Sequence, residues 1–318
     1  MFKTTPLQLL QREAGIWNAE DLLNYRQQCY AFKALSRPTG HPTNDILPPT
    51  FRYGELDAQP GQYSSSNLDW TKDNSQKSLG KHLAKQLASC LEVNLEAGFE
   101  TIYSNLPLFQ GEVVIKEEKL AKEEALLEYP EDLVIFTDGA SQDKAGAGLV
   151  WQLPYRADLY QRGIPLGEGK EALDAELYAI KEGLLVAQRE AQRPETNAIR
   201  VFSDSQRALK LIQKPITEGS DILLEIHNIA AGLRKPTTLY WVPGHKNIPR
   251  NELVDQVAKE AALGPSRDSF ISLGYIRKRI QEKYKQETLN PLILRGKRSL
   301  VARYLQLKLG HAIVGTYL

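Results

Sequence analysis

The sequence predicts an α/β protein with a mixed sheet, because closely spaced strands are followed by strands that alternate with helices. Residues 133–138 form a continuous apolar run, and two further runs follow at the short spacing of an antiparallel meander. Strands separated by helices form right-handed parallel crossovers, so we expect five strands with helices packed on the sheet. The expected order is strands 133–138, 146–153 and 162–168, helix 172–190, strand 199–203, helices 205–213 and 220–233, strand 238–242 and helix 250–263.

The regions on either side of this pattern are expected to be mainly helical extensions. Residues 1–105 combine short helical patterns with a proline-rich loop at 37–75 and leucines every four residues from 79 to 95. Residues 106–130 are rich in both signs of charge and are expected to be a linker to the domain at 131–263. Residues 264–318 are expected to hold helices at 272–287 and 299–309, separated by Asn290-Pro291.

Charge is unevenly distributed along the chain. Residues 264–318 hold 11 Lys and Arg against 3 Asp and Glu, a net of +8, whereas the remainder holds 29 against 36, a net of −7. A basic extension beside an acidic body favours contact with a polyanion. The alternative is a solvated helical tail.

Cysteine and apolar content exclude several classes of protein. The two cysteines, Cys29 and Cys90, are far apart and lack metal-ligand spacing, which argues against a disulfide framework and a structural zinc site. The first residues lack the apolar run of a signal peptide, and no stretch approaches the length of a membrane span. We therefore expect no membrane contact and an intracellular protein, nuclear or cytoplasmic and not secreted.

Four carboxylates stand out by their positions. Asp138 and Asp204 each end an apolar strand, and sites in parallel α/β sheets form beyond the carboxyl ends of strands. Glu176 and Asp255 lie on helical faces otherwise occupied by small residues, where a buried carboxylate needs a cation or a donor. Grouped carboxylates repel one another unless a cation lies between them, so we expect a divalent-metal site.

Each candidate also has a purely structural interpretation. An aspartate after a strand can cap the following turn or helix, and Glu176 could be a core residue bonded to backbone N–H groups. His245 lies in the loop WVPGHKNIPRN, where Gly244 provides backbone freedom. A loop histidine is usually just exposed, but here, before an acidic helix, it can carry a proton near neutral pH.

The segment 131–263 resembles the type 1 ribonuclease H family. The motifs TDGA, AELYAI, FSDS and W-V-P-G-H…NE-x-x-D occur in the family's order. The resemblance implies a ribonuclease H-like five-stranded mixed sheet and cleavage of the RNA strand of RNA–DNA hybrids. It implies two Mg²⁺ ions, with Mn²⁺ as an alternative. It assigns metal binding to Asp138, Glu176, Asp204 and Asp255, product release to His245, and substrate contacts to Gly139, Ala140, Ser205 and Asn251.

The sequence departs from the family pattern at two places. SQDKAGAG follows TDGA, so the Asn-Pro turn of many cellular enzymes is lacking, and 37 positions separate Asp204 from Trp241, which leaves no room for the basic helix of some bacterial members. The flanks resemble segments bordering this domain in fungal non-LTR retrotransposon polyproteins. They suggest a retroelement-derived fragment that is truncated or domesticated. The alternatives are a non-catalytic nucleic-acid-binding remnant of a reverse transcriptase and a structure-specific DNA nuclease of the same fold.

Overall fold

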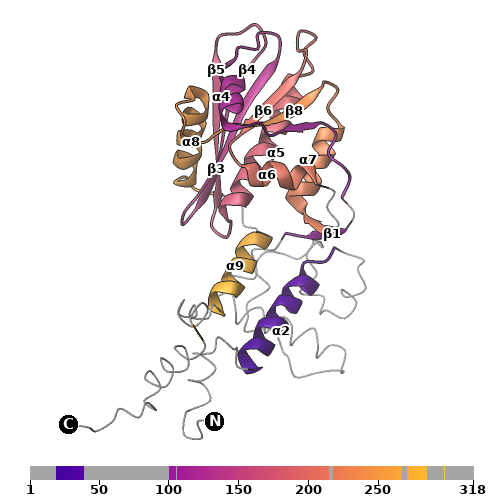
Figure 1. Cartoon of the computed structure of the whole chain (residues 1–318). Helices are drawn as coiled ribbons and strands as arrows, with labels where there is room; N and C mark the ends of the chain where they lie inside the picture. The colour runs from indigo at the N-terminus through magenta and orange to yellow at the C-terminus, as the bar shows by residue number, and fades with distance from the viewer. Residues whose placement is uncertain are drawn as a thin grey trace, which may run out of the picture.

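The centre of the molecule is a six-stranded mixed sheet flanked by helices on both faces (Figure 1). The computed structural model describes residues 19–38, 100–104, 106–214, 218–266, 271–284 and 297. The strand order is β2-β8-β6-β3-β4-β5. The mixed α/β class predicted from the sequence is confirmed. The strands are β2 (Glu112–Val114), β3 (Leu133–Ser141), β4 (Ala145–Gln152), β5 (Leu159–Gly167), β6 (Ile199–Ser203) and β8 (Thr237–Trp241).

The register places Asp138 of β3 beside the carboxyl ends of β6 and β8. Strands β3, β4 and β5 form the antiparallel meander, whereas β3 pairs with β6, and β6 with β8, in parallel. Thr137 lies opposite Ser203, which in turn lies opposite Trp241. Asp138 and Asp204 each follow one of these paired residues, so the topology alone brings them to the same edge.

Residues 106–130, which we expected to be a linker, contain two elements of the folded domain. Strand β2 pairs in parallel with β8 and makes the sheet six-stranded rather than five-stranded. Helix α4 (Glu118–Leu126) buries Ala121 and Ala125, and Val113 packs against the main core. The sequence did not predict these elements because β2 has only three residues and α4 is mostly charged.

Helix α8 (Pro249–Ala262) covers one face of the sheet, and α5 (Ala172–Glu190), α6 (Gln206–Gln213) and α7 (Asp221–Ala231) lie on the other side (Figure 1). The α8 face holds a stack in which the rings of Phe136 and Phe202 are 4.7 Å apart. Gly148 allows α8 to approach closely, because a Cβ there would lie 2.5 Å from the Val254 carbonyl oxygen. On the opposite face, Leu149 of β4 and Leu184 of α5 are buried in the same hydrophobic core.

A helix pair, α2 (Ala19–Leu35) and α9 (Leu273–Lys283), lies beyond one end of the sheet (Figure 1). Its own small core includes Phe32, Ile276 and Ile280. Beside it, β1 (Ile102–Ser104) pairs with β7 (Glu218–Ser220) in a two-stranded sheet. The leucine repeat at 79–95, the helix expected at 299–309, most of the loop expected at 37–75, and Cys90 lie outside the described residues. Within the described part, no helix is long and apolar enough to cross a membrane.

Candidate active site

Three of the four predicted carboxylates lie together at the end of the sheet where strands β6 and β8 terminate. Asp138 lies inside β3 and does not end its strand as predicted, because the pairing with β4 continues to Ser141. Asp204 directly follows β6, as predicted, and Glu176 lies in the first turns of α5. Each offers a carboxylate oxygen, and the three oxygens lie within 4.8 Å of one another. Such a group of oxygen ligands has the composition that hard divalent cations prefer.

The carboxylates disfavour one another's ionisation. Burial, together with the negative charges of Asp204 and Asp255, raises the pKa of Asp138 to about 7. Burial and the neighbouring charge of Asp138 raise the pKa of Glu176 well above its ordinary value. The pKa of Asp204 is raised chiefly by burial, although His245 counteracts the shift. A cation in this space would remove the repulsion that these shifts express.

One carboxylate oxygen of this group has no hydrogen-bond partner in the described part of the chain. The Oε2 atom of Glu176 is buried and has no hydrogen-bond partner among the described residues. The backbone N–H of Gly139 donates a hydrogen bond to the Glu176 carboxylate, which leaves the second oxygen unpaired. A buried carboxylate oxygen without a donor is costly. The residues present therefore fit a bound divalent cation, and the cluster could hold one.

Asp255 lies beside the group but is not one of the three close carboxylates. It sits on α8, and its side chain is 24% exposed and forms an ion pair with Lys259 at 2.7 Å. Asp255 is nevertheless in hydrogen-bonding contact with Asp138, and both this contact and its charge raise the pKa of Asp138. The i, i+4 spacing of Asp255 and Lys259 on one helix face favours this ion pair, whereas the sequence motif suggested only a metal-binding role for Asp255.

The loop between β8 and α8 brings His245 to the same edge. His245 and Asn247 both adopt positive φ angles, 53° and 57°, and His245 is exposed. The positive charge of the imidazole lowers the pKa of Asp204, which places the ring within electrostatic range of that carboxylate. Gly244 packs directly against Asp204, since a Cβ there would lie 2.8 Å from Oδ2.

Two of the predicted substrate-contacting residues, Gly139 and Ser205, make packing or capping contacts within the protein. Gly139 lies under α5, where a Cβ would be 2.2 Å from the Glu176 backbone nitrogen, and Ala140 follows it half-buried. The hydroxyl of Ser205 caps α6 by accepting a hydrogen bond from the Ala208 N–H at 3.4 Å. Gly139 and Ser205 thus have structural roles that do not depend on a substrate.

Asp204 accepts hydrogen bonds from two residues that flank the His245 loop, one in α8 and one in β8. Asn251, only 3% exposed, donates a hydrogen bond to its carboxylate, and its own Oδ1 is buried without a partner among the described residues. The indole Nε1–H of Trp241 donates to the Asp204 carbonyl oxygen at 3.0 Å. The sequence pattern gives Trp241 no such role, because nothing local shows which backbone group its indole contacts.

The four acids, His245 and the residues that hold them lie within one contiguous segment of the chain. Residues 130–263 match the RNase H family model. The RNase H segment contains all four acids and His245, whereas β2, α4 and the α2–α9 pair lie outside it. The match supports a hydrolase of the nuclease class acting on RNA–DNA hybrids, and the acidic group supports metal binding.

Proposed function

We propose that this protein is an endoribonuclease that cleaves the RNA strand of RNA–DNA hybrids with the help of divalent metal ions. The observation that carries the proposal is the group of three carboxylates within 4.8 Å at the sheet edge, inside a segment that matches RNase H. The resemblance of the flanking segments to retrotransposon polyproteins supports a retroelement origin.

The acids would serve as metal ligands. Asp138, Glu176 and Asp204 would hold two Mg²⁺ ions, or Mn²⁺, and Asp255 would complete the set from α8. Bound metal would activate a water molecule and stabilise the leaving 3′ oxygen of the phosphodiester. Loss of any one acid would favour a non-catalytic remnant, but the chain retains all four.

The remaining residues orient these acids and assist product release. Asn251 and Trp241 hold Asp204 from the carboxylate and the carbonyl side, which fixes its direction without a metal. His245, exposed on its loop and within electrostatic range of Asp204, would assist release of the product. Discrimination in favour of a hybrid would come from sensing 2′-hydroxyl groups on one strand and DNA backbone geometry on the other.

A panel of labelled duplexes tests the proposal. The full chain is incubated with an RNA–DNA hybrid, a DNA duplex and an RNA duplex of one sequence, with Mg²⁺ or with EDTA. We expect cleavage of the hybrid's RNA strand alone and only with Mg²⁺. Cleavage of the DNA duplex would instead support a structure-specific DNA nuclease. Binding without any cleavage would support a non-catalytic remnant.

A further inference from the structure

The α2–α9 helix pair, which lies outside the RNase H segment, is attached next to the candidate active site. The hydroxyl of Ser272 donates to the carboxylate of Asp174, two residues before Glu176 in α5. The Ser272 N–H donates to the carbonyl oxygen of Gly169 at 2.9 Å, and Lys278 pairs with Glu171 at 2.7 Å. The start of α9 therefore packs against the same end of α5 that carries Glu176.

This attachment is buried, so the pair has a fixed position relative to the sheet. Ser272 is fully buried and Glu100 is 5% exposed, and the Glu100 carboxylate accepts a hydrogen bond from the Leu273 N–H at 2.9 Å. The Ile102 N–H donates to the Ser36 carbonyl oxygen, which joins α2 to β1. Strand β1 in turn pairs with β7 beside α7. The helix pair is thus part of the folded unit.

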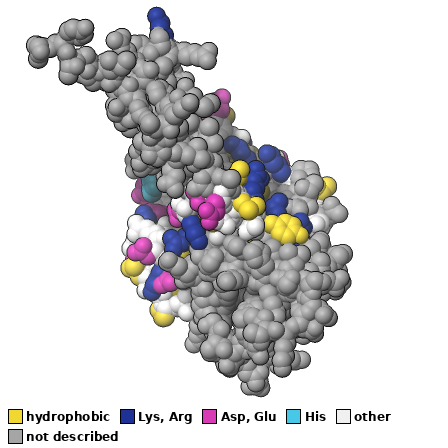
Figure 2. Space-filling view, turned by 90° about the horizontal axis from the view of Figure 1, so that it is seen from below, with side chains coloured by type: hydrophobic (Ala, Val, Ile, Leu, Met, Phe, Trp, Pro, Cys, Tyr) yellow, Lys and Arg dark blue, Asp and Glu magenta, His cyan; other side chains and the backbone are white. Residues whose placement is uncertain are grey.

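The helix pair supplies positive charge that the RNase H segment lacks. Residues 130–263 hold 16 Lys and Arg against 19 Asp and Glu, whereas residues 19–38 and 271–284 together hold 7 against 3. In Figure 2, seen from below, Lys and Arg side chains are visible among Asp, Glu and hydrophobic side chains. A net-negative segment with grouped carboxylates repels a polyanion, so a nearby cationic surface would offset that repulsion.

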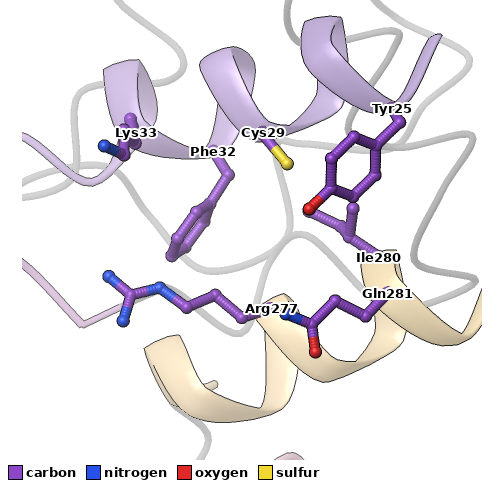
Figure 3. A pocket seen from close by; sticks show the side chains of 7 residues that line it. All are labelled: Tyr25, Cys29, Phe32, Lys33, Arg277, Ile280 and Gln281. Atoms are coloured by element: carbon purple, nitrogen blue, oxygen red, sulfur yellow. The ribbon is translucent and has the colours of Figure 1, made fainter. Parts of the chain in front are cut away.

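A hollow of about 180 Å³ lies between the two helices, with Lys33 from α2 and Arg277 from α9 at its edge (Figure 3). The Arg277 guanidinium lies 5.8 Å from the ring centroid of Phe32. Phe32 is only 3% exposed, so its ring packs beneath Arg277 and is not accessible to a nucleobase. Lys33 and Arg277 are both exposed and form no ion pair with the described residues.

We propose that the α2–α9 pair is a second nucleic-acid contact surface, which binds backbone phosphates of the hybrid beyond the cleavage site through Lys33 and Arg277. The inference rests on the proposed function and names how this chain holds the same substrate. Two cations without acidic partners among the described residues are free to bind anions, and the Lys and Arg side chains of nucleic-acid-binding proteins make many of their contacts to backbone phosphates. The contact is therefore independent of base sequence.

The test compares two double variants of the full chain. Lys33→Gln/Arg277→Gln neutralises the proposed surface while keeping long polar side chains. Arg156→Gln/Arg234→Gln removes the same charge from two exposed residues in loops at the opposite edge of the sheet. Circular dichroism and thermal unfolding establish that both remain folded. Affinity for a labelled RNA–DNA hybrid is measured between about 50 and 200 mM salt in an Asp138→Asn background, and kcat and KM are measured with Asp138 intact.

Each phosphate contact contributes about 0.9 to the slope of log affinity against log salt, so losing two contacts lowers the slope by about 2. When the salt concentration rises across this range, the fold-loss of affinity should be about ten times smaller for the variant than for the parent. KM should be raised and kcat little changed. The control variant should keep the parental slope and KM. An unchanged slope in the Lys33/Arg277 variant, or an equal change in the control, would overturn the inference while cleavage persists. Failure of the parent chain to bind and cleave the hybrid would instead overturn the proposed function, and this inference with it.

Discussion

The Cα atom of Gly244 faces the carboxylate of Asp204 so closely that a methyl group there would lie 2.8 Å from Oδ2. The loop that carries His245 therefore packs directly on one of the three grouped acids. Because Asn251 also donates to Asp204, the position of this carboxylate depends on the segment that follows β8. Loop geometry and the candidate metal site are thus coupled.

Gly244→Ala should impair activity far more than stability. The added methyl group must displace either the loop or the Asp204 carboxylate, and a misplacement of about 1 Å can cost on the order of 100-fold in rate. We expect kcat to fall about 10- to 100-fold, with a thermal midpoint close to the parent's. Gly232→Ala is the control, because a Cβ there meets its nearest atom at 3.4 Å. Parental activity in Gly244→Ala would contradict the coupling.

His245→Ala should slow turnover without abolishing it. The imidazole is exposed and interacts with Asp204 only through its charge, so it is not part of the carboxylate group itself. Steady-state and single-turnover rates on a labelled hybrid separate cleavage from product release. We expect the steady-state rate to fall more than the single-turnover rate. A loss as complete as that of Asp138→Asn would show that the role of His245 is misassigned.

Gly139→Ala should destabilise the fold. A Cβ at Gly139 would lie 2.2 Å from the Glu176 nitrogen and 2.4 Å from the Ala175 carbonyl carbon, so α5 must move away from β3. Overpacking of this kind costs about 1–3 kcal/mol. The free energy of unfolding from urea titration measures the loss. A variant with parental stability but weaker hybrid binding would instead support the substrate contact that the family resemblance assigns to Gly139.

Glu100→Gln should change how stability depends on pH. Burial raises the pKa of Glu100 to about 7, with Asp174 and Asp221 adding to the shift. A raised pKa means that the folded state binds the proton more tightly than the unfolded state. The contribution of Glu100 is therefore fully present below about pH 4.5 and is lost as the pH rises towards 7.

Glutamine cannot ionise, so the variant should gain on the parent by about 3 kcal/mol between about pH 4.5 and 7. Urea unfolding of both proteins across this range measures the difference. Asp174 and Asp221 remain in both proteins, but they are coupled to Glu100, so the difference between the two curves includes this coupling. Parallel curves for the two proteins would show that Glu100 does not titrate in this way.

The strong periodic patterns of the sequence predicted most of the central sheet. The apolar runs that became β3 and β6 and the small-residue faces of α5 and α8 also located the four acids near one edge. What the local pattern could not show was pairing across long stretches of chain. Strand β2 has three residues and acquires its identity from β8, and α2 meets α9 although more than 200 residues separate them.

The finer geometry of the site was equally hidden from the sequence. Spacing does not reveal that Asp255 contacts Asp138 and also pairs with Lys259, while it is not one of the three carboxylates whose oxygens lie within 4.8 Å of one another. The indole of Trp241 holds a backbone carbonyl group 37 positions away, a contact that only the parallel pairing of β6 with β8 creates. Long-range register, rather than local propensity, decides these features.

The most direct test of a metal-dependent hybrid nuclease is cleavage of a labelled RNA–DNA hybrid by the parent chain and by Asp138→Asn, prepared side by side over a range of Mg²⁺ concentrations. Asparagine keeps the volume of Asp138 and removes its charge from the centre of the carboxylate group. We predict Mg²⁺-dependent cleavage of the RNA strand by the parent and none by the variant, with unchanged circular dichroism. Equal cleavage by both proteins, or cleavage by the parent that persists in EDTA, would contradict a metal-dependent mechanism centred on Asp138.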